Sequence, residues 1–364
     1  MAKRKKRYWF IFGITAFLVY VFAAAQPIQK EVVLSPRWLS SLDSGIPVYL
    51  DSSTQGEKIP GGFIPFQLGG RYGYFSDDGF YPINQIQKNY VSISDEFYSE
   101  YEGFPSSLQI NNSDGRDFLE IDDPEGYPFF LDGKIFLLGK GQDTLYSLDE
   151  RGNTNWIYEF PAPLTCIDSA SGFILAGTLD GTIELIDSEG KQFMPPFEPG
   201  GSRLTVILGC AISADASRFA IISGIDDQRF LVLERTGDRY RVVYNEFLTS
   251  GYRRPVKIFF IENDSRIVFE RENGIGIYDI ASRNSAKIHL EGELCAFDDN
   301  GGGGLLFAVT SIGPINKRLI AIRYPDTIVI EAPFRSESSF LTRRDSHIFA
   351  GGDSAIVSLI LKEK

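Results

Sequence analysis

Histidine and cysteine, which most catalytic and metal sites require, are scarce in this sequence. Its 364 residues include two histidines, His289 and His347, and three cysteines. Neither histidine lies near a serine or cysteine motif and no HExxH pair occurs, which argues against a Ser-His-Asp triad, a Cys-His site and a zinc site. No cysteine pair has CxxC spacing, so zinc knuckles and redox dithiols are also absent. We therefore expect a protein that is not an enzyme and that holds no cofactor and no metal.

Two stretches that resemble ligand loops each lack an essential part. Residues 111–117 resemble the start of a calcium loop, but the acid that ends such a loop is missing, so we expect a turn. The glycine run at 301–304 is followed by neither a lysine nor a helical pattern. We expect it to form a flexible loop and not a phosphate cradle.

Basic residues are also few compared with acidic ones beyond the N-terminus. The formal net charge is -12, and the five basic residues at positions 3–7 all precede a hydrophobic run. The chain beyond them holds 31 basic against 48 acidic residues, a net charge of about -17. A body this acidic repels phosphate backbones, so binding of DNA or RNA is a poor hypothesis.

The first residues read as an export signal. A basic stub at 1–7 precedes an apolar run at 8–25, and spanning helices need roughly 17 to 25 apolar residues. The positive-inside rule then leaves the N-terminus in the cytoplasm and sends the rest across a bacterial cytoplasmic membrane to its periplasmic side. We predict an uncleaved transmembrane signal-anchor; the alternative is a signal peptide cleaved after Ala25, where three alanines precede Gln26. No cysteine follows the run, which excludes a lipoprotein anchor.

Beyond a predicted linker at 26–37, the chain is a succession of short β-type runs. Seven paired-strand units recur, and their starts are separated by 62, 39, 45, 48, 39 and 42 residues. These units are 72–83, 134–149, 173–187, 218–234, 266–279, 305–323 and 347–361. A period of 40 to 50 residues with several strands per unit is typical of propeller blades. We predict an all-β propeller of seven blades over 38–364, and of eight only if the apolar runs at 47–50 and 63–66 form a blade of their own.

The best repeat carries a family resemblance. A glycine-bounded strand at 133–139 leads into Leu-Tyr-Ser-Leu-Asp at 145–149, then Gly152 and Trp156, and a looser copy runs over 172–190. This resembles the PQQ-like propeller repeat, while residues 211–223 resemble a WD40-like blade. The resemblance extends to the propeller scaffold subunit of the outer-membrane β-barrel assembly machinery, although that protein is a lipoprotein. It implies a non-catalytic scaffold that binds protein partners in the cell envelope.

Two other functions stay open at this point. One is a ligand-binding or sensor propeller for a sugar, a peptidoglycan fragment or a small metabolite. The other, weaker one is a quinoprotein dehydrogenase, for which the ring of docking tryptophans is lacking because only Trp156 fits the tryptophan position. The partner, the pathway and the oligomeric state cannot be read from the sequence.

The three cysteines occupy one position of the repeat. Cys166, Cys210 and Cys295 each lie seven to ten residues before the start of a paired-strand unit. One repeat position implies one environment, which in a propeller is the innermost strand. We predict three buried, unreactive thiols and neither metal ligands nor a redox switch.

The long first interval of 62 residues suggests a partner-binding segment. We predict that residues 92–130 carry roughly fifteen to twenty residues more than a blade connection needs and form surface loops. Aromatic residues there would anchor a partner and acids would attract a basic one, unless the aromatics are ordinary core residues of strands. The candidate partner-binding residues are Asp95, Glu96, Phe97, Tyr98, Tyr101, Phe104, Asp122, Asp123 and Tyr127.

The predicted topology can be tested with reporter fusions. A reporter that is active only outside the cytoplasm is expected to be active when fused after Lys364, because the basic residues precede the hydrophobic run. A reporter that needs the cytoplasm should be silent at the same position. The reverse pattern of activity would show that the charge argument assigns the wrong side.

Overall fold

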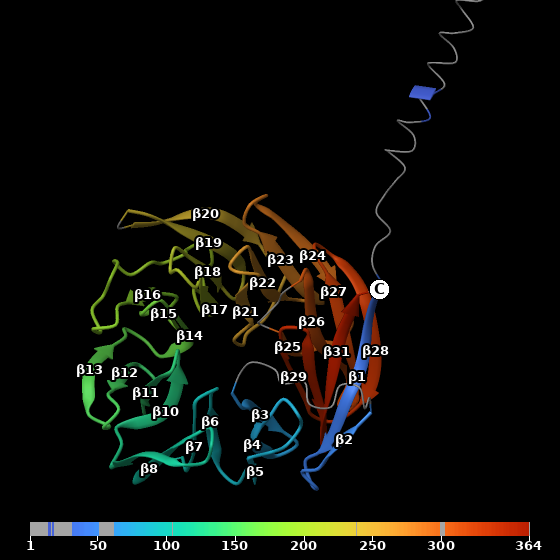
Figure 1. Ribbon diagram of the computed structural model, residues 1–364. Coiled ribbons are helices and arrows are strands. Elements are labelled where there is room, and N and C mark those ends of the chain that lie inside the picture. Colours follow the sequence, from blue (N-terminus) through green and yellow to red (C-terminus); the bar gives the residue numbers. More distant parts are fainter. Residues whose placement is uncertain are drawn as a thin grey trace, which may run out of the picture.

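The computed structural model describes residues 14, 15, 17, 31–50, 62–103, 105–237, 239–298 and 303–363. In this part of the chain, thirty-one β-strands form eight sheets arranged as a ring around a central axis (Figure 1). The fold is therefore an all-β propeller, as predicted. It has eight blades, and the prediction of seven was wrong.

Blades are numbered here along the chain. Blade 1 contains β3 (Ile64–Leu68), β4 (Arg71–Phe75) and β5 (Ile83–Ile86), and blade 2 contains β6 (Tyr90–Ile93), β7 (Phe97–Tyr101), β8 (Ser107–Asn112) and β9 (Asp117–Asp122). Blade 3 contains β10 (Gly126–Leu131), β11 (Lys134–Gly139), β12 (Thr144–Leu148) and β13 (Thr154–Glu159), and blade 4 contains β14 (Leu164–Ala170), β15 (Phe173–Thr178) and β16 (Ile183–Ile186).

The second half of the ring has longer strands. Blade 5 contains β17 (Ile207–Ile212), β18 (Arg218–Ser223), β19 (Arg229–Thr236) and β20 (Arg239–Phe247), and blade 6 contains β21 (Ile258–Ile261), β22 (Arg266–Arg271), β23 (Gly274–Asp279) and β24 (Asn284–His289). Blade 7 contains β25 (Glu293–Phe297), β26 (Leu305–Ile312), β27 (Asn316–Arg323) and β28 (Thr327–Arg335). Blade 8 contains β29 (Ser339–Arg344), β30 (His347–Gly352), β31 (Ala355–Glu363), β1 (Val32–Ser41) and β2 (Pro47–Tyr49).

Burial along the strands follows their position in the blade. Middle strands such as β18 are buried almost throughout, because neighbouring blades cover both faces of each sheet. Fourth strands such as β13 alternate between exposed and half-buried residues, since they form the outer wall. Packing between blades is direct: the rings of Phe230 in blade 5 and Phe269 in blade 6 stack with centroids 4.1 Å apart. The hydrophobic core is thus a ring of interfaces between sheets.

The missed blade lies in the segment that was predicted to be surface loop. Residues 92–130 contain most of blade 2 and the inner strand β10 of blade 3. Blade 1 also misled the count, because its three described strands correspond to the second, third and fourth strands of the other blades. With β3 taken as a second strand, the second strands start 33, 37, 39, 45, 48, 39 and 42 residues apart, so the repeat has no long interval.

The direction of β3 supports this assignment. Leu68, at the end of β3, lies beside Gly351, near the end of β30. Ile64, at the start of β3, lines a cavity with Arg344, the last residue of β29, and with Asp345 in the turn that leads into β30. The two strands therefore run the same way, and β30 is the second strand of blade 8. Among the described residues, blade 1 has no inner strand ahead of β3.

The N-terminal part of the chain closes the ring. Strand β1 pairs antiparallel with β31 through nine residue pairs, from Val32 opposite Glu363 to Ser41 opposite Ala355. Strand β2 adds a fifth strand to the same sheet, so the apolar run at 47–50 completes the last blade, while the run at 63–66 belongs to blade 1. The propeller therefore begins at Val32, inside the segment 26–37 that was predicted to be a linker.

The predicted membrane segment 8–25 lies outside the described residues except for Ile14, Thr15 and Phe17. Within the described ranges, no helix has the length and apolar character needed to cross a bilayer. The N-terminal transmembrane helix stays a prediction.

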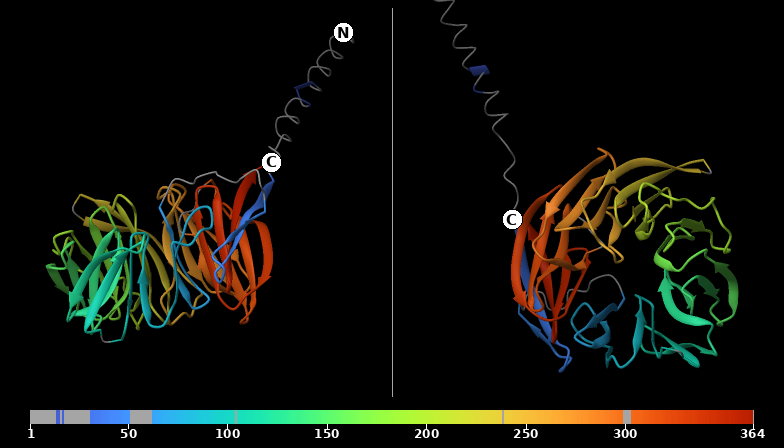
Figure 2. Two further views of the ribbon diagram at one scale, coloured as in Figure 1. Left: turned by 60° about the horizontal axis from the view of Figure 1, so that its bottom comes forward. Right: turned by 180° about the vertical axis from the view of Figure 1, so that it is seen from behind.

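The two ends of the ring differ in the loops that they carry. One end, named here the connection face, carries the connections between blades and the turns between second and third strands. The other, the hairpin face, carries the turns between first and second strands and those between third and fourth strands. Strand β1 starts and β31 ends on the hairpin face, since Val32 pairs with Glu363. Figure 2 shows the ring from the side and from behind, where the connection face is seen.

Closure should depend on Trp38 of β1. This side chain is fully buried, its indole donates a hydrogen bond to the Asp77 carbonyl at 2.8 Å, and its ring lies 6.2 Å from Phe75 and 5.9 Å from Phe349. Trp38→Ala is expected to lower the free energy of unfolding by about 3 to 5 kcal/mol, measured by urea denaturation, because it leaves a cavity where the ring closes. The control is Leu39→Ala on the same strand, whose side chain is exposed; an equal loss in both variants would contradict this account.

Candidate functional site

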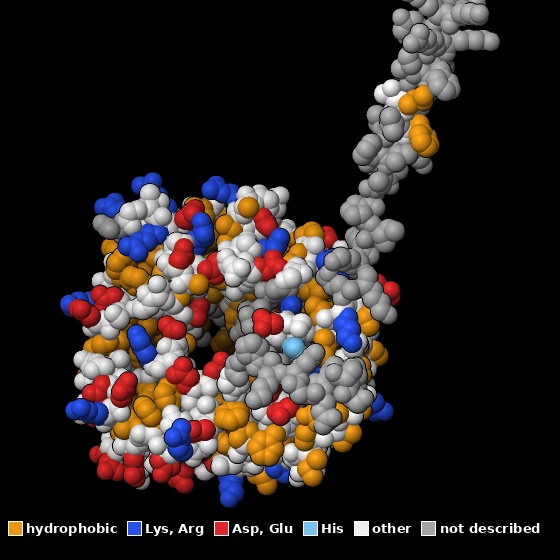
Figure 3. All heavy atoms as spheres, viewed as in Figure 1, with side chains coloured by type: hydrophobic (Ala, Val, Ile, Leu, Met, Phe, Trp, Pro, Cys, Tyr) orange, Lys and Arg blue, Asp and Glu red, His pale blue; other side chains and the backbone are white. Residues whose placement is uncertain are grey.

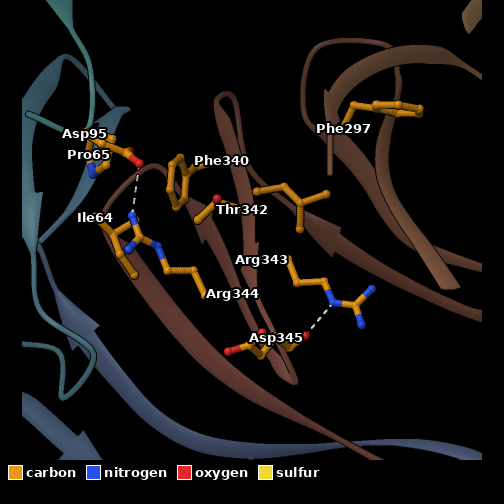
Figure 4. A pocket seen from close by; sticks show the side chains of 10 residues that line it. Ile64, Pro65, Asp95, Phe297, Phe340, Thr342, Arg343, Arg344 and Asp345 are labelled. Atoms are coloured by element: carbon orange, nitrogen blue, oxygen red, sulfur yellow. Dashed lines mark hydrogen bonds and ion pairs between the residues drawn. The ribbon is translucent and has the colours of Figure 1, made fainter. Parts of the chain in front are cut away.

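Two cavities open along the central axis, and the larger one lies toward the hairpin face. It measures about 710 Å³ and is walled mainly by β29, with contributions from β3, β25 and the turn after β6 (Figure 4). Arg344 forms an ion pair with Asp95 at 3.4 Å. Arg343 is buried and donates hydrogen bonds to the Asp345 carbonyl at 2.7 Å and the Leu305 carbonyl at 2.9 Å. Both cations of this cavity therefore already hold protein partners.

The second cavity lies toward the connection face, between the inner strands of blades 2, 3 and 4. Its volume is about 290 Å³, and its lining is largely apolar. The residues that line it are Ser92, Tyr101, Tyr127, Pro128, Phe129, Leu138, Leu164, Thr165, Cys166 and Ile167. Strand β6, the end of β7, and strands β10, β11 and β14 supply these residues, so three blades build one site.

A row of three tyrosines leads into this cavity. The ring of Tyr90 stacks on Tyr101 with centroids 6.0 Å apart, and Tyr101 lies 5.9 Å from Tyr127. The Tyr127 hydroxyl donates a hydrogen bond to the Gly103 carbonyl at 2.7 Å, and the Ser92 hydroxyl donates to the Pro128 carbonyl at 2.5 Å. These bonds join blade 2 to blade 3 and fix the cavity wall.

Carboxylates surround the same end of blades 2 and 3. Six acids lie where strands end or connect on the connection face: Glu102, Asp122, Asp123, Glu125, Asp143 and Glu159. None of them forms an ion pair with any residue that the structure describes. Burial raises the pKa of the Tyr146 hydroxyl, and the nearby charges of Glu125, Glu159 and Asp143 raise it further. Three of the six acids are therefore close enough to disfavour a negative charge on this tyrosine of blade 3. The surface around the cavity is strongly negative.

A family model described as beta-propeller protein matches residues 1–364. This chain belongs to that β-propeller protein family. The propeller is 25% identical over 296 residues to an uncharacterized protein of Treponema pallidum (strain Nichols), covering 80% of this chain and 78% of that one. Solved structures similar to this propeller include BamB from Moraxella catarrhalis, with a TM-score of 0.63 at 13% identity over 90% of this chain and 100% of BamB. Apo AztD from Citrobacter koseri gives 0.53 at 14% identity over 80% of this chain and 88% of that one.

These structural likenesses establish architecture and confirm the predicted PQQ-like propeller resemblance. At such low identity they carry the fold alone, so the chemistry of this propeller has to come from its own residues.

The propeller divides the predicted partner-binding residues among three environments. Phe97 and Tyr98 are buried, so their prediction as docking anchors was wrong. They are neighbours on β7 and point to opposite faces of the sheet, where Phe97 joins the core toward blade 3 and Tyr98 the core toward blade 1. Phe104 lies outside the described residues.

The remaining predicted residues lie at opposite ends of the ring. Asp95 and Glu96 are exposed in the turn between β6 and β7, on the hairpin face. Tyr101, Tyr127, Asp122 and Asp123 lie on the connection face. Only this second group is brought together, around the smaller cavity.

Sequence reasoning missed the rest of that cavity. Tyr90 was not singled out, although it is the most exposed ring of the tyrosine row. Leu138, Leu164 and Ile167, which also line the cavity, were not singled out either. Nothing in the sequence pairs blade 4 with blade 2 at a common cavity, because adjacency to the central axis appears only once the ring is closed.

Acidic and apolar side chains also form clusters on the hairpin face, which faces the viewer in Figure 3. Acidic side chains gather over β8, and apolar ones gather over β4 and β5. Phe80, in the turn between β4 and β5, is exposed on this face. These features lie on the far side of the ring from the tyrosine row.

The cysteines lie where the repeat predicted them, on the innermost strands β14, β17 and β25. Cys210 is buried, whereas Cys166 and Cys295 are only half-buried, so the prediction of three buried thiols holds for one of them. Contact with the Cys166 thiol, together with burial, raises the pKa of Cys210 well above its ordinary value. Within the described ranges, no group of three His, Cys, Asp or Glu side chains is placed to hold a metal ion.

This arrangement predicts unequal thiol reactivity. In variants that keep one cysteine and carry alanine at the other two positions, Cys210 should react far more slowly with a bulky maleimide than Cys166 or Cys295. Its thiol is buried even without the Cys166 thiol beside it, and burial disfavours the thiolate, which is the reactive form. Mass spectrometry of timed reactions measures the rates, and unfolding in urea should make all three equal. Comparable native rates at the three positions would contradict the assigned packing.

Proposed function

We propose that this propeller is a non-catalytic, membrane-anchored scaffold on the extracytoplasmic side of a bacterial cytoplasmic membrane. Residues 8–25 would hold it in the bilayer, and a protein partner would dock on the connection face. The basic stub and apolar run support the anchor, and the likeness to BamB supports the class of fold.

One observation carries the docking surface. Several large apolar side chains on the connection face are more than half exposed: Ile86, Tyr90, Leu179, Leu204 and Phe247. They lie at strand ends, in blade connections or, for Leu179, in the turn between β15 and β16, where loops could have carried polar residues at no cost to the core. Exposed apolar residues spread over one end of a folded body favour contact with another protein.

The position of the propeller termini favours the same face. Strand β1 starts at Val32 on the hairpin face, so an anchor joined to it would leave the ring from that side. The connection face would then point away from the bilayer. A partner in the envelope would reach it without steric conflict with lipid.

A sensor function is the second candidate, favoured by the cavity of about 710 Å³ toward the hairpin face. That volume suits a small ligand. Its arginines, however, already bind Asp95 and backbone carbonyls, which leaves a ligand little free charge to recognise. The scaffold proposal therefore ranks first.

Site-specific photocrosslinking tests the scaffold proposal. A photoreactive residue at Leu179 or Leu204 in the full chain is expected to give discrete protein adducts in native membranes, because these side chains are exposed on the docking face. Glu150, exposed in the turn after β12 on the hairpin face, is the control position and should give none. Adducts only at Glu150, or none from the connection face at any position, would contradict the proposal. An alkaline carbonate wash should leave the chain in the membrane pellet if residues 8–25 anchor it.

A further inference from the structure

We infer that the smaller cavity and its tyrosine row bind an extended segment of a partner protein that carries lysine or arginine around a bulky apolar residue. This inference rests on the proposed scaffold function and names the chemistry of its partner. The contact would run over blades 2, 3 and 4 of the connection face.

The cavity provides a preformed apolar seat. Phe129, Leu138, Leu164 and Ile167 line a space of about 290 Å³, which lies at the lower end of ligand pockets and suits a single large side chain. Its walls belong to strands of three blades and are held by backbone pairing and by the bond from Ser92 to Pro128. Little conformational freedom is lost when a side chain enters a wall that is already fixed.

The tyrosine row suits an extended chain. The steps from Tyr90 to Tyr101 and from Tyr101 to Tyr127 are 6.0 and 5.9 Å between ring centroids. Alternate side chains of an extended segment repeat at roughly twice the rise of ~3.3 Å per residue. Side chains on one face of such a segment can therefore follow successive rings and end in the cavity, while its other face remains in solvent.

Charge identifies the partner segment as basic. The six acids Glu102, Asp122, Asp123, Glu125, Asp143 and Glu159 surround this end of blades 2 and 3. Among the described residues, the same stretch of the face carries two lysines, Lys88 and Lys140. A segment with lysines or arginines beside its apolar residue gains attraction here and binds faster, whereas an acidic segment is repelled. A neutral sugar would gain nothing from these charges.

The direct test uses a fluorescein-labelled peptide, Lys-Leu-Lys-Phe-Lys-Leu-Lys, and fluorescence anisotropy with the full chain in nanodiscs. Binding is expected, and it should weaken as salt rises because exposed charges are screened. The double variant Asp122→Asn with Glu125→Gln should weaken binding roughly 3- to 10-fold, the size expected for two exposed charge pairs. Both side chains are exposed, so the fold should not change.

A matched control removes the general effect of net charge. Asp132→Asn with Glu150→Gln makes the same charge change on the opposite, hairpin face of blade 3, and both residues are exposed. This control should leave binding unchanged. An equal loss in both double variants would mean diffuse attraction to an acidic body and would overturn the inference.

The cavity is tested without a change of charge. Leu138→Phe should fill the cavity and weaken binding of the peptide with a central Phe several-fold. Binding of a peptide with Ala at that position should not change. Thermal melting checks that the variant is folded; if it is not, Ile167→Phe in the same cavity replaces it. Equal effects on the binding of both peptides would contradict the proposal that the cavity binds an apolar side chain of the partner.

Two further outcomes separate this inference from others. Binding of chitohexaose in place of the peptide would overturn it in favour of a glycan site. If the peptide fails to bind while crosslinks from Leu179 and Leu204 persist, the scaffold function stands and the basic partner segment is wrong. If Leu179 and Leu204 give no crosslinks either, both the scaffold function and the basic partner segment are wrong.

Discussion

The pairing of β1 with β31 is the contact on which the rest of this propeller depends. If each blade used only strands that follow one another along the chain, no strand would link the first blade to the last. The ring could then open into an arc whose two end blades expose one face to water. Here the segment that begins at Val32 completes the sheet that ends at Glu363. Trp38 of this segment packs against both Phe349 of blade 8 and Phe75 of blade 1, and it shares one hydrophobic cluster with them where the two ends of the arc meet. Closure thus completes the ring of interfaces between neighbouring blades.

Closure also decides where a functional surface can exist. Once the ring is complete, the connections between blades all meet at one end, and short stretches of sequence from different blades become neighbours. The cavity beside Tyr101 and Tyr127 receives Leu164 from a strand that lies far along the chain, although each residue is locally an ordinary strand residue. A binding site of this kind has no motif, because its geometry belongs to the ring and not to a repeat.

The dependence of the site on the assembled ring explains which parts of the structure could be predicted from the sequence. Short apolar runs and tight turns were sufficient to predict an all-β propeller, and the recurrence of cysteine at one repeat position correctly identified three inner strands. The blade count failed at Phe97 and Tyr98, because acids beside aromatic residues look like a surface loop when the neighbouring blades are unknown. Both side chains are buried, since a blade is covered on both faces and its middle strands need no polar side. Blade 1 added to the error because its described strands begin at what is elsewhere the second position.

The acids of blade 2 have two separable roles. Asp117 and Glu120 are exposed on β9, the outer strand of its sheet, where charges prevent a free edge from pairing with another chain, whereas Asp122 ends this strand on the connection face. Asp123 and Glu125 lie beyond that edge, in the connection to blade 3, and protect no strand. Mutual repulsion among unpaired carboxylates opposes the folded state, so their concentration beside an apolar cavity is unfavourable for this chain alone. The basic partner segment proposed above would remove that repulsion on binding, which would give the same residues a favourable role in the complex.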